Sequence, residues 1–232
     1  MLENFWLNHS EIQALWLSFQ VGIWSTLLAL PFALFVGYQM ARRDFWGKSL
    51  LESLILLPLV MPPVATGYLL LISLGSKSVI GYYLKEFFGI QLAFHFPALI
   101  IASMVVSFPL LVRSIRTAIE LVDVGLEEAS RILGVGKFRT FFQITLPLAL
   151  PGVVSGTILA FARSLGEFGA TITFAGNIAG ETQTLPLAIY AQMQVPGGEE
   201  PTLRLVSISV VISFLAIGLS EWYIKKMKHD RD

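Results

Sequence analysis

The stretch EEASRILGVGKFRTFFQITLPLALPG, residues 127–152, interrupts a strongly apolar chain with charged residues and glycines. Just before it, Asp123 is of the type that caps the first turn of a helix. Gly134 and Gly136 lie at its centre, where the lack of a side chain permits a sharp turn. Pro147, near its end, suits the first turn of a following helix. The stretch therefore predicts a short helix, a glycine turn and a return to a long apolar helix.

The short helix, expected over residues 124–134, has two different faces. The charged side chains of Glu127, Glu128 and Arg131 share one side, and Glu127 and Arg131 are spaced for an ion pair within the helix. The apolar residues recur at helical spacing on the other side. They are Leu126, Ala129, Ile132 and Leu133. On this pattern alone, the helix could lie among lipid headgroups or contact another protein.

The composition of the chain is that of a membrane protein. Of its 232 residues, 55% are hydrophobic and 14% are charged, and the mean hydropathy is +0.71, whereas a soluble domain carries about 25% charged residues. The formal net charge is zero, so the chain has no basic field for nucleic acid. The absence of cysteine excludes disulfides, thiolate metal sites and a cysteine nucleophile. The start, Met1-Leu2-Glu3, lacks the basic region of a signal peptide, so we expect the first apolar run to be retained.

Windows with few or no charged residues predict the membrane spans. A span needs about 20 apolar residues, and five windows reach or approach that length. The predicted spans are 13–41, 52–75, 97–118, 147–167 and 204–223. We expect residues 1–232 to form one all-α transmembrane domain. It has a loop at 120–146 on one side and a loop with a short helix at 168–203 on the other.

The basic residues predict how this domain is oriented. When the spans alternate, twelve of the 16 Lys and Arg residues fall on the same side as the loop at 120–146. They are Arg42, Arg43, Lys48, Arg113, Arg116, Arg131, Lys137, Arg139, Lys225, Lys226, Lys228 and Arg231. Cytoplasmic loops carry an excess of Lys and Arg. We therefore expect the N-terminus outside, the C-terminus inside and the opening stretch in the cytoplasm.

Two alternatives, an intramembrane enzyme and a stand-alone channel, find little support in the residues. All three histidines fall outside the predicted spans, and the chain has no H-E-x-x-H or G-x-S-x-G motif. The tripeptide at 47–49 imitates the end of a phosphate-binding loop, but Arg42 stands where that motif requires glycine. No ring of charges marks a selectivity filter. We therefore expect no catalytic residue, no metal site and no ATP site on this chain.

A motif in the opening stretch resembles the E-A-A-x3-G-x9-I-x-L-P signature of ABC-importer permeases. It consists of Glu128, Ala129, Ser130, Gly134, Ile144, Leu146 and Pro147. Only Ser130 departs, because it replaces a second alanine. The resemblance implies that residues 124–134 are the coupling helix, which docks into a cleft of an ATPase subunit. Small residues at 129 and 130 would permit close approach, and Glu128 would reach polar groups of the partner.

Other segments extend the resemblance over essentially the whole chain. LPLVMPPVATGYLLL (57–71), SFPLLVRSIR (107–116) and FARSLGEFGATITFAGNIAGETQTLP (161–186) are similar to molybdate permeases, and sulfate permeases share a looser form of the last segment. The resemblance implies a type I ABC importer permease in a prokaryotic inner membrane. It also implies a second copy of the chain, two ATPase subunits that bind ATP and Mg²⁺, and a periplasmic molybdate-binding protein. Tungstate and sulfate remain alternative substrates.

Five residues are candidates for the transport path. Pro62 and Pro63 lie inside the second predicted span, where proline removes backbone hydrogen bonds. A broken helix can face a wet cavity, although an ordinary kink is the alternative. Arg163, Glu167 and Thr171 lie around the outer end of the fourth span, where ionisable residues face a pathway or pair with one another. Arg163 could attract the oxyanion while Glu167 tempers the affinity, or the two could form a structural ion pair.

A stripe of small residues also marks the fourth span. Gly152, Gly156 and Ala160 are four residues apart and lie on one side of a helix. Such a stripe permits close packing of a second helix. The spacing leaves open whether that helix belongs to the same chain or to a second copy.

Overall fold

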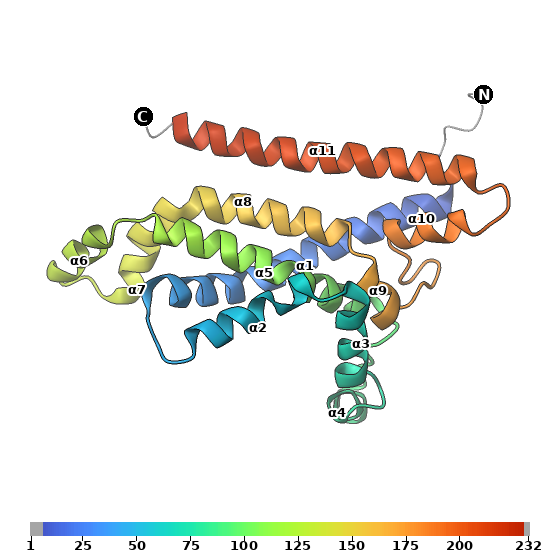
Figure 1. Cartoon of the computed structure of the whole chain (residues 1–232), viewed down its shortest axis with the longest axis horizontal. Coiled ribbons are helices and arrows are strands. Elements are labelled where there is room, and N and C mark those ends of the chain that lie inside the picture. The colour runs from blue at the N-terminus through green and yellow to red at the C-terminus, as the bar shows by residue number, and fades with distance from the viewer. Residues whose placement is uncertain (1–6, 230–232) are drawn as a thin grey trace.

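The structure, a computed structural model, describes residues 7–229 of the chain (Figure 1). Met1-Leu2-Glu3 and Arg231, used above for targeting and orientation, lie outside the described residues. Within them, every regular element is a helix, as predicted. The helices are α1 His9–Arg42, α2 Lys48–Val60, α3 Pro63–Leu74, α4 Val79–Phe88, α5 Phe96–Glu120, α6 Val124–Ile132, α7 Lys137–Thr140, the π-helix η1 Phe141–Thr145, α8 Leu146–Leu165, α9 Gly169–Phe174, α10 Leu185–Met193 and α11 Glu199–His229.

Four of the five predicted spans correspond to continuous helices that are long and apolar enough to cross a membrane. These are α1, α5, the run Lys137–Leu165 formed by α7, η1 and α8, and α11. The predicted span at 52–75 is different, because α2 and α3 form a pair bent by 112°. The break falls at Met61 and Pro62, immediately before Pro63 begins α3. A proline cannot donate the helical hydrogen bond and its ring crowds the preceding turn, so two prolines in succession divide the segment.

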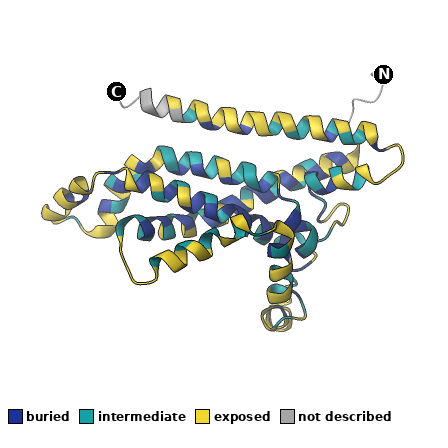
Figure 2. Cartoon of the chain, in the orientation of Figure 1, coloured by how far each residue is buried: buried dark blue, intermediate teal, exposed yellow. Residues whose placement is uncertain are grey.

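Helix α5 lies at the centre of the bundle, between α1 and α8 (Figure 1). In α5, 56% of the most apolar 18-residue stretch is buried, compared with 11% in α11, whose main contacts are with α8 and α10. Figure 2 shows the same contrast, with α5 largely buried and α11 largely exposed. Helix α2 has no buried residue at all. The exposed side chains of α2 and α11 are mostly apolar, which suits surfaces that face lipid or another chain.

Small residues let α5 and α8 approach closely. A Cβ atom built on Gly152 would lie 2.4 Å from the Cβ of Ala118, and one on Gly156 would lie 2.5 Å from the Cβ of Ser114. Both neighbours belong to α5, and Ala160 is part of the same core cluster. The small-residue stripe therefore packs within the chain, which answers the question that its spacing left open.

The two ends of the bundle differ in charge. One end of the bundle holds the turn from α1 to α2, the segment α6–α7 and the end of α11 (Figure 1). The other end holds the start of α1 and the helices α9 and α10. The first group carries most of the basic residues. The expected short helix within 168–203 is present as α10, and α9 is a second one. The gathering of basic residues at one end is compatible with the predicted orientation, which stays a prediction.

The packing of α5 against α8 predicts the effect of a larger side chain in the stripe. We expect Gly156→Leu to destabilise the fold by about 1–3 kcal/mol or more, because the added atoms overlap Ser114. The measurement is the thermal unfolding temperature of the purified chain in detergent. Gly218→Leu is the matched control, because a Cβ at this helical glycine of α11 meets nothing within 4 Å. Equal losses in the two variants would contradict the assignment of the close contact to Gly156.

Candidate functional site

The predicted coupling helix is present as α6, which projects with α7 from one end of the bundle (Figure 1). Asp123 caps it as expected, because its side chain accepts a hydrogen bond from the Gly125 amide at 2.8 Å. The helix ends at Ile132, two residues before the predicted limit. Gly134 has a φ of 82°, a left-handed conformation that favours glycine. Leu133 and Gly134 therefore belong to the turn.

The apolar residues of this segment face outward. Leu126, Ile132 and Leu133 are 48%, 86% and 83% exposed, respectively. Glu128 and Ala129 are also exposed. Glu127, which we expected on one charged side with Glu128 and Arg131, is instead buried at 1% exposure, whereas Glu128 is exposed. The helix thus presents an apolar surface away from its own bundle and a carboxylate toward it.

Ser130 does not lie on the outward surface. It is buried, and its hydroxyl is 3.1 Å from the hydroxyl of Thr140 in α7. We expected a small side chain here to permit close approach by a partner, but Ser130 lies between α6 and α7 of its own chain. Serine is suited to this position because it supplies a hydroxyl to an internal contact between α6 and α7.

The end of the motif lies in and beside a π-helical turn. Ile144 is in η1, and Leu146 and Pro147 are the first residues of α8. Pro147 lies in the first turn of α8, as expected, although α8 continues directly from α7 and η1 through residues 137–165. A proline ring crowds the carbonyl four residues earlier, which belongs to Gln143 in η1. The wider π-turn is the kind of local adjustment that accommodates such a residue in a continuous helix.

Pro63 of the broken span lies against the start of α9. A Cβ on Gly169 would lie 2.6 Å from the Cβ of Pro63, and one on Gly67 of α3 would overlap Thr173 of α9. The hydroxyl of Thr173 also donates to the carbonyl of Val64 at 3.4 Å. The structure therefore brings the second and fourth predicted spans together at their breaks, next to Pro62 and Pro63.

Arg163 and Glu167 form an ion pair with an N–O distance of 2.9 Å, in which Glu167 is 2% exposed and Arg163 33% exposed. Glu167 also accepts a hydrogen bond from the Ala170 amide at 2.8 Å, in the first turn of α9. Thr171 is fully buried, and its hydroxyl donates to the Phe168 carbonyl at 2.9 Å. These contacts match the structural alternative, an ion pair that joins α8 to α9. A role in transport for these residues stays a prediction.

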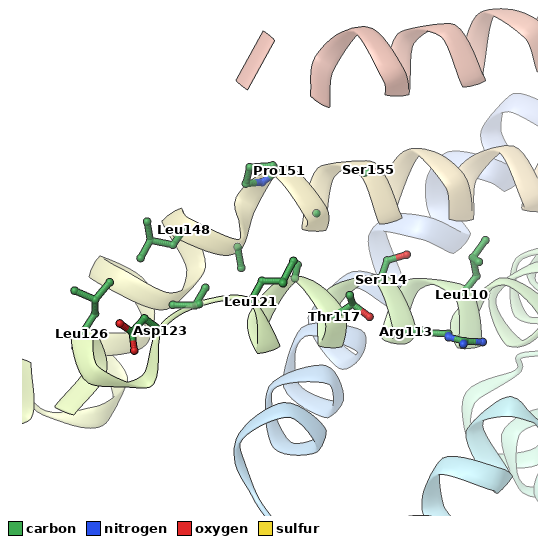
Figure 3. A pocket seen from close by; sticks show the side chains of 14 residues that line it. Leu110, Arg113, Ser114, Thr117, Leu121, Asp123, Leu126, Leu148, Pro151 and Ser155 are labelled. Carbon is green, nitrogen blue, oxygen red and sulfur yellow. The ribbon is translucent and has the colours of Figure 1, made fainter. Parts of the chain in front are cut away.

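An open groove that the sequence did not indicate runs along α5 and α8 beside their contact (Figure 3). It has a volume of about 750 Å³ and extends from Leu110 in α5 to Leu126 in α6. Its polar lining consists of Arg113, Ser114, Thr117, Asp123 and Ser155. The hollow therefore reaches from the membrane-spanning part of the bundle to the projecting helix. No metal centre accompanies it, since residues 7–229 contain no group of three His, Cys, Asp or Glu placed to hold an ion.

Comparisons with known proteins agree with the resemblance seen in the motifs. A family model for the "Binding-protein-dependent transport system inner membrane component" matches residues 29–229. The molybdenum transport system permease protein ModB of Haemophilus influenzae is 52% identical over 94% of this chain and 95% of its own length. ModB of Escherichia coli is also 52% identical, over 93% of this chain and 94% of its own.

A solved structure has the same fold. Inward facing conformations of the MetNI methionine ABC transporter match with a TM-score of 0.70 at 15% identity, over 93% of this chain and 94% of that chain. Since the family model covers most of the sequence and the helices can cross a membrane several times, the chain is a multi-pass membrane protein that belongs to the family of binding-protein-dependent transport system inner membrane components.

Proposed function

We propose that this chain is the membrane subunit of an ATP-driven importer of molybdate. The observation that carries the proposal is the 52% identity, over nearly the full length, to two proteins named as molybdenum transport permeases. The solved relatives support the fold alone. Sulfate and tungstate are the alternative substrates, because both are tetrahedral oxyanions of the same charge.

The partners follow from the family, whose members work with an ATPase and a periplasmic binding protein. We propose that two copies of this chain assemble with two ATPase subunits, and that ATP and Mg²⁺ bind to the ATPase. The exposed apolar surfaces of α2 and α11 support a second copy as well as a bilayer, because a lone subunit leaves them uncovered. The chain itself would perform no catalysis.

The coupling of ATP to transport would use the outward surface of α6. Closure of the ATPase pair would displace this helix, and the spans would rock from an inward-facing to an outward-facing state. The loaded binding protein would favour the second state and release its anion into the transport path between the spans. Such coupling requires two states that ATP and the loaded binding protein favour to different extents. The exposure of Leu126, Ile132 and Leu133 supports docking on this side.

Reconstitution tests the proposed function. We expect liposomes that contain the chain, its ATPase and its binding protein to accumulate molybdate when ATP is supplied, and to prefer it over sulfate. The measurement is uptake of each anion with and without ATP. Molybdate uptake without ATP would contradict the energy source, and a preference for sulfate would contradict the substrate.

Docking through α6 predicts the effect of a charge on its outward surface. We expect Ile132→Asp to weaken association with the ATPase about 30-fold or more, as a buried charge does at the centre of an interface. The measurement is the amount of ATPase that co-purifies with the chain. Phe88→Asp is the control, because Phe88 is a 71% exposed apolar residue on α4, far along the chain from α6. Normal co-purification with Ile132→Asp would exclude this surface as the docking site.

The proposed orientation can be tested with single cysteines, because the chain has none of its own. Trp46 is fully exposed in the turn between α1 and α2, and Lys85 is exposed on α4. We expect a membrane-impermeant maleimide to label Lys85→Cys in intact cells and Trp46→Cys only after permeabilisation. The opposite pattern would place the N-terminus in the cytoplasm.

A further inference from the structure

The carboxylate of Glu127 is held inside the chain by three other side chains. Its Oε1 accepts hydrogen bonds from the Nε of Arg42 at 3.0 Å and from the Thr145 hydroxyl at 2.8 Å. Its Oε2 is 3.5 Å from an Nη of Arg131 in the same helix. A carboxylate at 1% exposure is stable only when charged and hydrogen-bonding partners surround it. Glu127 therefore depends on partners from three separate elements.

Arg42 connects this carboxylate to the membrane helices. It is the last residue of α1, so a displacement of its side chain acts directly on the end of that helix. Its Nη2 also donates to the carbonyl of Val122 at 2.8 Å. Val122 lies between α5 and α6 and belongs to the main core cluster. One guanidinium thus joins α1, the end of α5 and the projecting helix α6.

The π-helical turn η1 supplies the second connection. Thr140 and Thr145 contact Ser130 and Glu127, which are neighbours on the inner side of α6. Five residues make about 1.4 turns of an α-helix, so two such threonines would ordinarily point in different directions. The hydrogen bonds of a π-helix join residues five apart, which brings positions 140 and 145 toward the same side. The π-turn therefore lets the run from α7 to α8 hold α6 at two points.

These polar contacts are the main attachment of α6 within the described residues. None of the residues 124–132 belongs to a hydrophobic core cluster there. The apolar side chains of the helix face outward instead. A force applied to the outward surface must therefore pass to the bundle through the hydrogen bonds and ion pairs of the inner surface and through the two ends of the helix.

From this arrangement we infer that Glu127 is a positioning residue for transport, which transmits movement of α6 to α1 through Arg42 and to α8 through Thr145. The inference rests on the proposed function, since it concerns how ATP hydrolysis is converted into anion movement. It adds a residue outside the docking motif, because Glu127 faces the bundle while the motif residues Glu128 and Ala129 face outward.

The test compares two buried glutamates in the complete transporter. Glu127→Gln keeps the size of the side chain and removes its charge. Glu11→Gln is the matched control, because Glu11 is 2% exposed and pairs with Arg204 at 2.6 Å at the other end of the bundle. Each variant is reconstituted with the ATPase and the binding protein. The measurements are molybdate imported per ATP hydrolysed, stimulation of hydrolysis by the loaded binding protein, thermal stability and co-purification of the ATPase.

We expect Glu127→Gln to retain the ATPase but to import about 10-fold less molybdate per ATP, with a matching loss of stimulation, as for a coupling free energy of ordinary size. Glu11→Gln is expected to lower thermal stability and to leave the ratio unchanged. A ratio in Glu127→Gln equal to that of the unmodified transporter would overturn the inference, and so would an equal fall in both variants.

A milder variant keeps the test decisive if Glu127→Gln fails to assemble. Thr145→Val removes one hydrogen bond to Glu127 with little change of shape, and we expect it to lower the ratio in the same direction. An unchanged ratio in an assembled Thr145→Val transporter would overturn the transmission to α8. Failure of the proposed function is recognised separately, because the unmodified complex would then show no ATP-driven molybdate uptake. If it imported another oxyanion, the same ratio would be measured with that anion.

Discussion

The close approach of α5 to α8 is the contact on which the rest of the structure depends. Apolar side chains gain little by leaving lipid for another apolar surface, so helices in a bilayer associate through tight packing and polar contacts. Gly152 against Ala118 and Gly156 against Ser114 provide that packing. Helices α6 and α9 are both attached directly to this pair, since α6 follows the end of α5 and α9 follows the end of α8. Their positions are therefore set by how α5 and α8 fit together.

Polar contacts then fix the position of helices that the packing brings near. Glu11 and Arg204 join α1 to α11 at one end of the bundle, and Glu127 and Arg42 join α6 to α1 at the other. Between them, the hydroxyls of Ser25 and Ser164 lie 3.1 Å apart and connect α1 to α8. A buried charge without its partner costs several kcal/mol. These pairs therefore favour one arrangement of the helices over the many that apolar packing alone would permit.

Local features of α6 could be predicted from the sequence, whereas its contacts could not. The cap at Asp123 and the turn at Gly134 depend on residues a few positions away, and both are present as expected. Helical spacing groups Glu127 with Glu128 and Arg131, but it does not say which side of a helix faces its bundle. Arg42, the partner of Glu127, lies 85 residues earlier in the chain. Pro62 and Pro63 indicated a break or a kink in the span at 52–75, but neither they nor hydropathy gave its size, so the bend of 112° became known only from the structure.

The division of α6 into an apolar outer side and a polar inner side has a mechanical consequence. Apolar contacts are not directional, so the ATPase proposed to dock on Leu126 and Ile132 could shift slightly without losing affinity. Hydrogen bonds and ion pairs weaken quickly when their geometry changes, so the inner contacts of Glu127 and Ser130 resist sliding. A helix built in the opposite way, with an apolar inner side, could shift against its own bundle when pushed. In the transmission inferred above, the contacts of Glu127 and Ser130 would make movement of α6 and movement of α1 and η1 parts of one displacement.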